Sequence, residues 1–229
     1  MEQFVNGLTL SLPQGTFPLS TDSMVLGDFV RLRKNAKVLD LGSGAGTLGI
    51  LLCGKDASCT VTGVELEKQS HLAALENIER NGLNHRLHSI CADLKTVNRL
   101  FPAGSFQCCV SNPPYFSGGA ASKTHPTARR NDFCSMDALF QAASWAVKYG
   151  GDFFLVHKPE YLASLFASAA KTQLTPKRLR LVRHKPQDPV NLVLVQCRKG
   201  AKPGLIWEEM HLFETDGAPS AEYKKIYHL

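Results

Sequence analysis

The sequence lacks the long apolar runs and paired cysteines that mark several classes of protein. No stretch approaches the roughly 18 to 20 apolar residues that a membrane helix needs, and the N-terminal MEQFVNGLTL has no basic segment followed by an apolar one, as a secretory signal would. The seven cysteines are odd in number and include no C-x-x-C pair, so neither a disulfide framework nor a zinc site is expected. We expect a protein of the reducing cytoplasm, with no membrane and no metal.

Internal repeats and low-complexity linkers are also absent. A chain of 229 residues with 44% hydrophobic residues suits one large domain with small additions. We expect an N-terminal hairpin and helix over residues 1–36, a central domain over 37–200, and a C-terminal extension over 201–229 that packs on the same domain.

The net charge of +6 comes entirely from the second half of the chain. Residues 1–115 contain ten basic and ten acidic residues, whereas residues 116–229 contain sixteen and ten. The densest basic stretch spans residues 171–187 and contains no acid. Such a region is typical of phosphate binding, although lysines along a solvated strand edge would give the same pattern. Its candidate phosphate-binding residues are Lys177, Arg178, Arg180, Arg183 and Lys185.

Apolar patterns typical of strands and helices alternate along most of the chain. Strands are predicted at 38–41, 59–66, 88–94, 106–112 and 151–157, and helices at 20–32, 47–53, 67–83, 135–148 and 159–172. A hairpin is predicted at 4–12 around Asn6-Gly7, and two late strands at 177–184 and 191–199. This order predicts a Rossmann-like, doubly wound, three-layer α/β/α fold. We expect seven mostly parallel strands with an antiparallel hairpin at one edge.

The first strand of the central domain runs into a glycine loop, VLDLGSGAGTLG. Gly42, Gly44 and Gly46 allow a sharp turn and a close approach of the backbone to a ligand. Glu65 ends the second predicted strand, where a carboxylate can accept both hydroxyls of a ribose. A nicotinamide cofactor and S-adenosylmethionine could both use this arrangement.

Two acidic residues favour S-adenosylmethionine. Asp40 immediately precedes the loop, close to where a cationic sulfonium and ammonium would lie. Asp93 ends the third predicted strand, where its carboxylate could accept from an adenine amino group. The same sequence pattern would also arise from a purely structural turn and two unrelated acidic residues on the surface.

The fourth predicted strand ends in SNPPY, beside the first strand and at the same crevice. An amine conjugated to a ring is a poor nucleophile, and two acceptors that draw its hydrogens out of plane make its lone pair available. Asn112 offers a side-chain carbonyl, and Pro113 offers a backbone carbonyl held by Pro114, which restricts the chain on both sides. Tyr115 could stack on the base. Catalysis would then consist mainly of positioning.

These motifs carry a family resemblance. DLGSGAG (40–46), VE (64–65), AD (92–93) and NPPY (112–115) are similar to the motifs of class I S-adenosylmethionine-dependent methyltransferases. GTFPLSTDSMVLGDF, THPTARRNDFCSMDALFQAA, LVHKPEYLASL, RLRLVRHKPQDPVNLVLVQCRKG and EYKKIYHL resemble the bacterial tRNA1(Val) (adenine(37)-N6)-methyltransferase family, and this resemblance covers nearly the whole chain. Two positions after AR (128–129) the family often has an acid, whereas this chain has Asn131, followed by Asp132.

The resemblance implies a tRNA partner and S-adenosylmethionine as cofactor. We expect a monomer or weak homodimer. It implies a catalytic set of Asn112, Pro113, Pro114 and Tyr115. It implies a cofactor-binding set of Thr21, Asp22, Asp40, Gly42, Gly44, Gly46, Glu65, Asp93, Leu94 and Asn112. Beside the basic stretch, Lys123, Arg129 and Arg130 in the loop 116–134 would contact RNA.

Three other functions use parts of the same pattern. A protein glutamine N5-methyltransferase shares the NPPY chemistry but carries a helical domain ahead of it, and only thirty-nine residues precede Asp40 here. A DNA adenine methyltransferase usually needs a separate target-recognition region. A nucleotide- or RNA-binding module with a decayed site would not need an intact Asn112.

Overall fold

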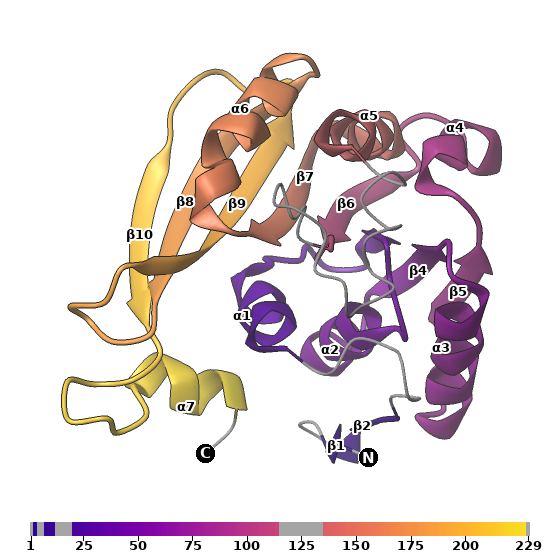
Figure 1. The fold of residues 1–229 in the computed structure, drawn as a ribbon. Coiled ribbons are helices and arrows are strands. Elements are labelled where there is room, and N and C mark those ends of the chain that lie inside the picture. The colour runs from indigo at the N-terminus through magenta and orange to yellow at the C-terminus, as the bar shows by residue number, and fades with distance from the viewer. Residues whose placement is uncertain (1, 4–6, 12–19, 115–134, 228–229) are drawn as a thin grey trace, which may run out of the picture.

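The computed structural model of the chain describes residues 2–3, 7–11, 20–114 and 135–227. Their centre is an eight-stranded sheet in the order β10-β8-β9-β7-β6-β3-β4-β5 (Figure 1). Its strands are β3 (Lys37–Leu41), β4 (Thr60–Glu65), β5 (Leu87–Cys91), β6 (Phe106–Ser111), β7 (Val147–His157), β8 (Leu174–Arg183), β9 (Val190–Lys199) and β10 (Ile206–His211). Only β9 runs antiparallel to its neighbours. The predicted doubly wound α/β fold is therefore confirmed.

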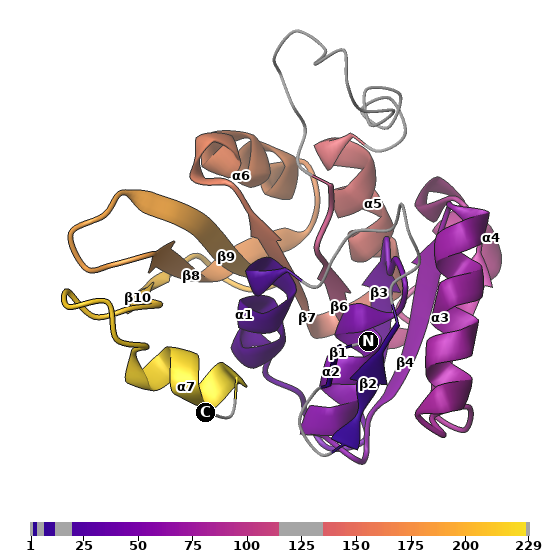
Figure 2. The same cartoon turned by 60° about the horizontal axis from the view of Figure 1, so that its bottom comes forward.

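Helices cover both faces of this sheet (Figures 1 and 2). One face carries α1 (Thr21–Phe29), α2 (Thr47–Lys55), α3 (Lys68–Arg80) and α7 (Ala221–Tyr227). The other carries α4 (Val97–Leu100), α5 (Met136–Ala146) and α6 (Leu162–Ala170). Successive side chains of β3 point to opposite faces of the sheet and join the two hydrophobic cores. Val38 packs on the first face, and Leu39 and Leu41 pack on the second. None of the helices in these described parts is long and apolar enough to cross a membrane.

The strand count and the sheet edge differ from the prediction. The sheet has eight strands rather than seven, because β10 pairs in parallel with β8. The predicted late strands do form an antiparallel pair, but β10 rather than this pair lies at the edge. The predicted helix 135–148 ends at Ala146, because Val147 already pairs with Phe106 as the first residue of β7.

The N-terminal hairpin is present as a short pair of strands. β1 (Glu2–Gln3) pairs antiparallel with β2 (Thr9–Leu10) across the predicted turn, of which Asn6 lies outside the described residues. β2 is fastened to α3, since Asn81 exchanges two side-chain hydrogen bonds of 2.7 and 2.8 Å with the backbone of Thr9.

Candidate active site

The sheet changes its winding direction between β3 and β6. The chain proceeds from β3 through β4 to β5 on one side, and then returns to β6 and β7 on the other. In open sheets of this kind, ligands bind outside the carboxyl ends of the strands at this point. The Ser111 hydroxyl donates a 2.7 Å hydrogen bond to the Leu41 carbonyl, so the ends of the two strands are held together.

The glycine loop follows β3 at this crevice and has the backbone conformation that only glycine adopts readily. Gly42, Gly44 and Gly46 have φ angles of 76°, 56° and 86°. A β-carbon built on Gly42 or Gly44 would meet nothing within 4 Å, so the loop borders open space there. The predicted role of these glycines is to let a ligand approach the loop backbone closely, and that role requires such open space.

Two side chains hold the loop in place. Glu65, the last residue of β4, accepts 2.8 Å hydrogen bonds from the backbone N–H groups of Gly44 and Glu67, one at each carboxylate oxygen. Asn77 of α3 is fully buried and donates a 3.0 Å hydrogen bond to the carbonyl of Ala45. Sequence reasoning found Glu65 from its strand-end position. It missed Asn77, which reads as an ordinary helix residue.

Asp40 lies beneath the loop with its carboxylate buried. It is 1% exposed, and neither carboxylate oxygen has a hydrogen-bond partner among the described residues. Burial, followed by the nearby charge of Glu65, raises the pKa of Asp40 from 3.8 to about 8. A buried carboxyl without partners is costly, and a cation bound nearby would offset that cost.

The acid after β5 is placed slightly differently from the prediction. β5 ends at Cys91, so Asp93 is not a strand residue. It caps the short turn Leu94–Thr96 instead, accepting a 2.9 Å hydrogen bond from the backbone N–H of Lys95. The adjacent Ala92 N–H donates to the Glu65 carbonyl at 2.9 Å, so both acids remain at the same edge of the sheet.

The Asn-Pro-Pro segment leaves β6 at the crevice. Asn112 is half-buried, Pro113 is buried and Pro114 is exposed, while Tyr115 lies outside the described residues. The side-chain nitrogen of Asn112 donates a 2.9 Å hydrogen bond to the hydroxyl of Ser23. Sequence reasoning missed Ser23, because the two residues are 89 positions apart and no local pattern links them.

Ser23 belongs to the first turn of α1, as do the predicted cofactor residues Thr21 and Asp22. Ser20 caps this helix with its side chain. The Thr21 hydroxyl accepts a 3.4 Å hydrogen bond from the hydroxyl of Tyr227, which ends α7. The first turn of α1 therefore connects the Asn-Pro-Pro segment to the C-terminal helix.

The predicted RNA-contacting arginines in the middle of β8 are used inside the protein. The Arg178 side chain is 6% exposed and donates to both oxygens of Glu208, at 2.8 and 3.1 Å. Arg180 is 17% exposed and pairs with Glu208 at 2.9 Å and Asp28 at 3.2 Å. If either arginine turned outward to bind a phosphate, the carboxylates of Glu208 and Asp28 would lose their ion-pair partner while still partly buried, which is costly. This pairing argues against contact between these arginines and RNA phosphate.

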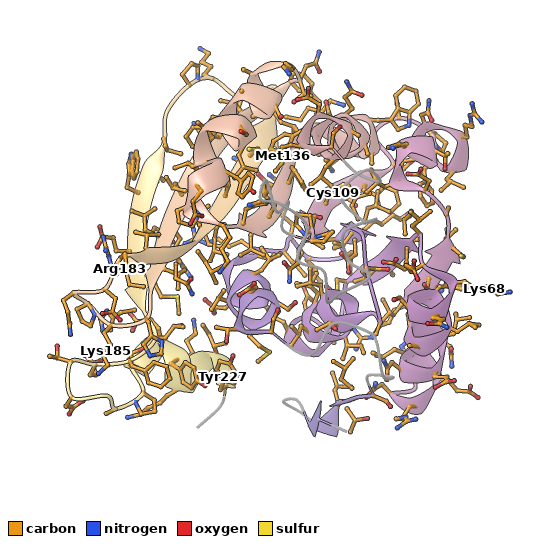
Figure 3. The ribbon with its side chains drawn as sticks, viewed as in Figure 1. Lys68, Cys109, Met136, Arg183, Lys185 and Tyr227 are labelled. Atoms are coloured by element: carbon orange, nitrogen blue, oxygen red, sulfur yellow. The ribbon has the colours of Figure 1, made fainter. Side chains whose placement is uncertain are left out.

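The remaining basic residues are Lys177 within β8, Arg183 at its carboxyl end, and Lys185 just beyond it. β8 runs parallel to β10 and, through β9, in the same direction as β7. Arg183 and Lys185 therefore lie at the carboxyl-end edge that also carries the crevice, on the same side as Tyr227 (Figure 3). Lys177 lies six residues back along the strand, about 20 Å away. Lys123, Arg129, Arg130 and Asn131 lie outside the described residues.

Comparison with known proteins identifies the family. The methyltransferase small domain model matches residues 20–164. A tRNA1(Val) (adenine(37)-N6)-methyltransferase of Photobacterium profundum is 30% identical over 90% of this chain and 87% of its own. A protein of the same name from Shewanella halifaxensis is 32% identical over 66% of this chain and 61% of its own.

Solved structures support the same fold. A predicted O-methyltransferase of Agrobacterium tumefaciens is 20% identical, with a TM-score of 0.76 over 91% of this chain and 96% of its own. Thermus thermophilus TrmN is 18% identical, with a TM-score of 0.60 over 77% of this chain and 48% of its own. A geranyl diphosphate methyltransferase in complex with S-adenosylmethionine is 13% identical, with a TM-score of 0.59 over 77% and 84%. The chain belongs to the methyltransferase small domain family and, within it, to the tRNA1(Val) (adenine(37)-N6)-methyltransferases.

Proposed function

We propose that this protein transfers a methyl group from S-adenosylmethionine to the exocyclic N6 amine of an adenine in tRNA, and that the substrate is adenine 37 of a valine tRNA. The observation that carries the proposal is the position of Asn112, Pro113 and Pro114. They leave β6 directly beside the glycine loop that follows β3, with the ends of the two strands joined by Ser111. A tRNA substrate places the enzyme in the cytoplasm.

The residues around the loop suit S-adenosylmethionine. Gly42 and Gly44 leave room for a ligand against the backbone. Glu65 has further lone pairs for ribose hydroxyls, since each carboxylate oxygen accepts one hydrogen bond from the described part of the chain. Asp40 supplies a buried carboxyl that has no hydrogen-bond partner within the described parts of the chain, and a cationic ligand would stabilise its ionised form. Thr21, Asp22, Asp93 and Leu94 complete the proposed binding set.

In the proposed methyl transfer, the main task of the protein is to position the target amine against the methyl group of the cofactor. When bound, S-adenosylmethionine supplies an electrophilic methyl carbon on a sulfonium sulfur. The carbonyl oxygens of the Asn112 side chain and the Pro113 backbone would accept hydrogen bonds from the two N–H groups of the target amine, so that its lone pair is no longer conjugated with the ring and can attack the methyl carbon as the bond from that carbon to sulfur breaks. Tyr115 is the proposed stacking partner of the base. After methylation, one of these hydrogens leaves to solvent as a proton.

RNA contact is proposed along the carboxyl-end edge of the sheet. Arg183 and Lys185 lie there, and Lys123, Arg129 and Arg130 follow the Asn-Pro-Pro segment in the chain. Arg178 and Arg180 are no longer part of this proposal, because Glu208 and Asp28 occupy them. Lys177 is the fourth residue of β8, six residues before Arg183, and so lies farther from the carboxyl end of the strand.

The test is transfer of labelled methyl groups to total tRNA, DNA and protein, followed by nucleoside analysis. We expect label in tRNA only, as N6-methyladenosine, and loss of most turnover in Asn112→Ala with cofactor affinity nearly unchanged. Label on protein glutamine or on DNA would replace the proposal with one of its rivals. Equal turnover in Asn112→Ala and the parent would refute the role given to Asn112.

A further inference from the structure

The hydrogen bond between Asn112 and Ser23 links the reacting segment to a different part of the fold. It joins the end of β6 to the first turn of α1 over 2.9 Å. Ser23 is 7% exposed, so little solvent competes for the contact. The serine has no place in the binding sets derived from sequence motifs, and its hydroxyl is not needed to cap α1, because Ser20 does that.

A carboxamide can face its surroundings in two orientations that differ by a half-turn and have nearly the same shape. Only the orientation that presents oxygen can accept hydrogens from a target amine, whereas the other presents a second donor. In this structure the side-chain nitrogen of Asn112 donates to Ser23, and the oxygen is the other arm of the same planar amide, about 120° away around the carbonyl carbon.

We propose that Ser23 is a positioning residue that holds the carboxamide of Asn112 with its oxygen toward the target amine. This inference rests on the proposed N6-adenine transfer. It assigns Ser23 no contact with substrate. Its effect should appear in turnover rather than in binding, because a misoriented amide still leaves the pocket and the cofactor site intact.

The element that carries Ser23 is itself well fixed. The Ser23 N–H donates to the Ser20 carbonyl at 3.1 Å and to its side-chain oxygen at 3.4 Å. At the other end of α1, the Lys55 ammonium donates to the carbonyls of Gly27, Asp28 and Val30 at 2.7 to 2.9 Å. A helix held at both ends presents its hydroxyl at a constant position.

The experiment compares Ser23→Ala with Ser23→Thr, which keeps the hydroxyl. Loss of one hydrogen bond that orients a reacting group should lower kcat of Ser23→Ala about three- to tenfold. The KM for tRNA and the Kd for S-adenosylmethionine should stay within about twofold of the parent, and Ser23→Thr should recover most of kcat. Ser168→Ala is the matched control, because Ser168 is also buried and donates a single 2.6 Å hydrogen bond, to Asp137, away from the crevice. It should leave kcat unchanged.

A second comparison uses the Asn112→Asp background. A carboxylate offers an oxygen in either orientation, so adding Ser23→Ala should there lower kcat less than it does in the parent. Parental kcat in Ser23→Ala, or an equal loss in both backgrounds, overturns the inference while the proposed function stands.

The contact can also be tested without activity. The side-chain amide signal of Asn112 in a nitrogen-15 NMR spectrum is identified by its absence in Asn112→Ala. It should move and exchange faster with water in Ser23→Ala, and an unmoved signal refutes the contact. A parent that methylates no tRNA rejects the proposed function, and this measurement still decides whether Ser23 holds the amide.

Discussion

Replacing Asp40 by asparagine should make the free protein more stable and its cofactor binding weaker. Asp40 is 1% exposed, and its pKa is raised to about 8 by burial and then by Glu65. In the unfolded chain its pKa is about 3.9. Between these two values the folded protein binds one more proton than the unfolded chain, so its free energy of unfolding falls as the pH rises from about 4 to about 8.

The magnitude follows from the distance between pH and the unfolded pKa. Each pH unit above 3.9 lowers the free energy of unfolding by up to ~1.4 kcal/mol, which gives at most about 4 kcal/mol at pH 7. Relaxation of the surroundings reduces such values, so we expect about 2 kcal/mol. Asp40→Asn has no proton to bind, and its asparagine amide has nearly the same volume. It should therefore be more stable than the parent by about this amount at pH 7 and equally stable near pH 4.

Denaturant unfolding of both proteins at several pH values between 4 and 8 measures this difference. Calorimetric titration with S-adenosylmethionine in buffers of different ionisation enthalpy measures how many protons are released on binding. The parent should release a proton at pH 7, because a bound cation favours the carboxylate form of Asp40. Asp40→Asn should release none and bind roughly tenfold more weakly. A parent whose stability does not fall between pH 5 and 8, or an Asp40→Asn variant less stable at every pH, refutes the reasoning.

Three further substitutions test the loop, the anchor of α1 and the RNA edge. A β-carbon at Gly63 would lie 2.5 Å from the Ser43 hydroxyl and 2.7 Å from its β-carbon, so Gly63→Ala should displace the glycine loop and weaken S-adenosylmethionine binding roughly tenfold in calorimetry. Adding Ser43→Gly should restore affinity, and unchanged affinity in the single variant would contradict this account. Lys55→Met removes three hydrogen bonds to carbonyls at the end of α1 and should cost about 1–2 kcal/mol in denaturant unfolding, whereas parental stability would show that water replaces the ammonium. Lys185→Glu should weaken tRNA binding about three- to tenfold and flatten its salt dependence, and Lys177→Glu is the control, since each lysine makes one contact to a backbone carbonyl. Equal losses in the two lysine variants would remove the RNA contact from the crevice edge.

The glycine loop and its contact with Glu65 could be predicted from the sequence because local rules dictate them. Gly42, Gly44 and Gly46 need left-handed backbone angles, and Glu65 must end a strand to reach the loop. Both requirements produce a sequence pattern that spans only a few neighbouring residues and can therefore be recognised. Asn77 and Ser23 were missed because their side chains bond to partners at least 32 positions away in the chain, which leaves no periodic pattern.

β10 was not predicted, and the arginines of β8 were assigned to RNA, for one shared reason. Strand prediction looks for apolar alternation, and IWEEMH breaks it with two glutamates. In the structure Glu208 faces β8 and pairs with Arg178 and Arg180, and hydrogen bonds from Arg178 hold the pKa of Glu208 below its usual value. The strand is thus joined to the sheet by ion pairs as well as by backbone hydrogen bonds. A sequence scan finds a basic cluster there and an acidic strand elsewhere, and nothing local indicates that they neutralise each other.

The same arginines also contact the end of the helix that carries Ser23. Arg178 lies over the ring of Phe29, 4.2 Å from its centroid, and donates to the Phe29 carbonyl at 3.4 Å, while Arg180 pairs with Asp28. These contacts fix the last turn of α1, whose first turn presents Ser23 to Asn112. Basic residues that the charge pattern assigned to RNA therefore help to set the position of the helix that orients the reacting amide. Since a helix transmits a displacement along its axis, loosening these ion pairs should affect turnover before it affects RNA affinity.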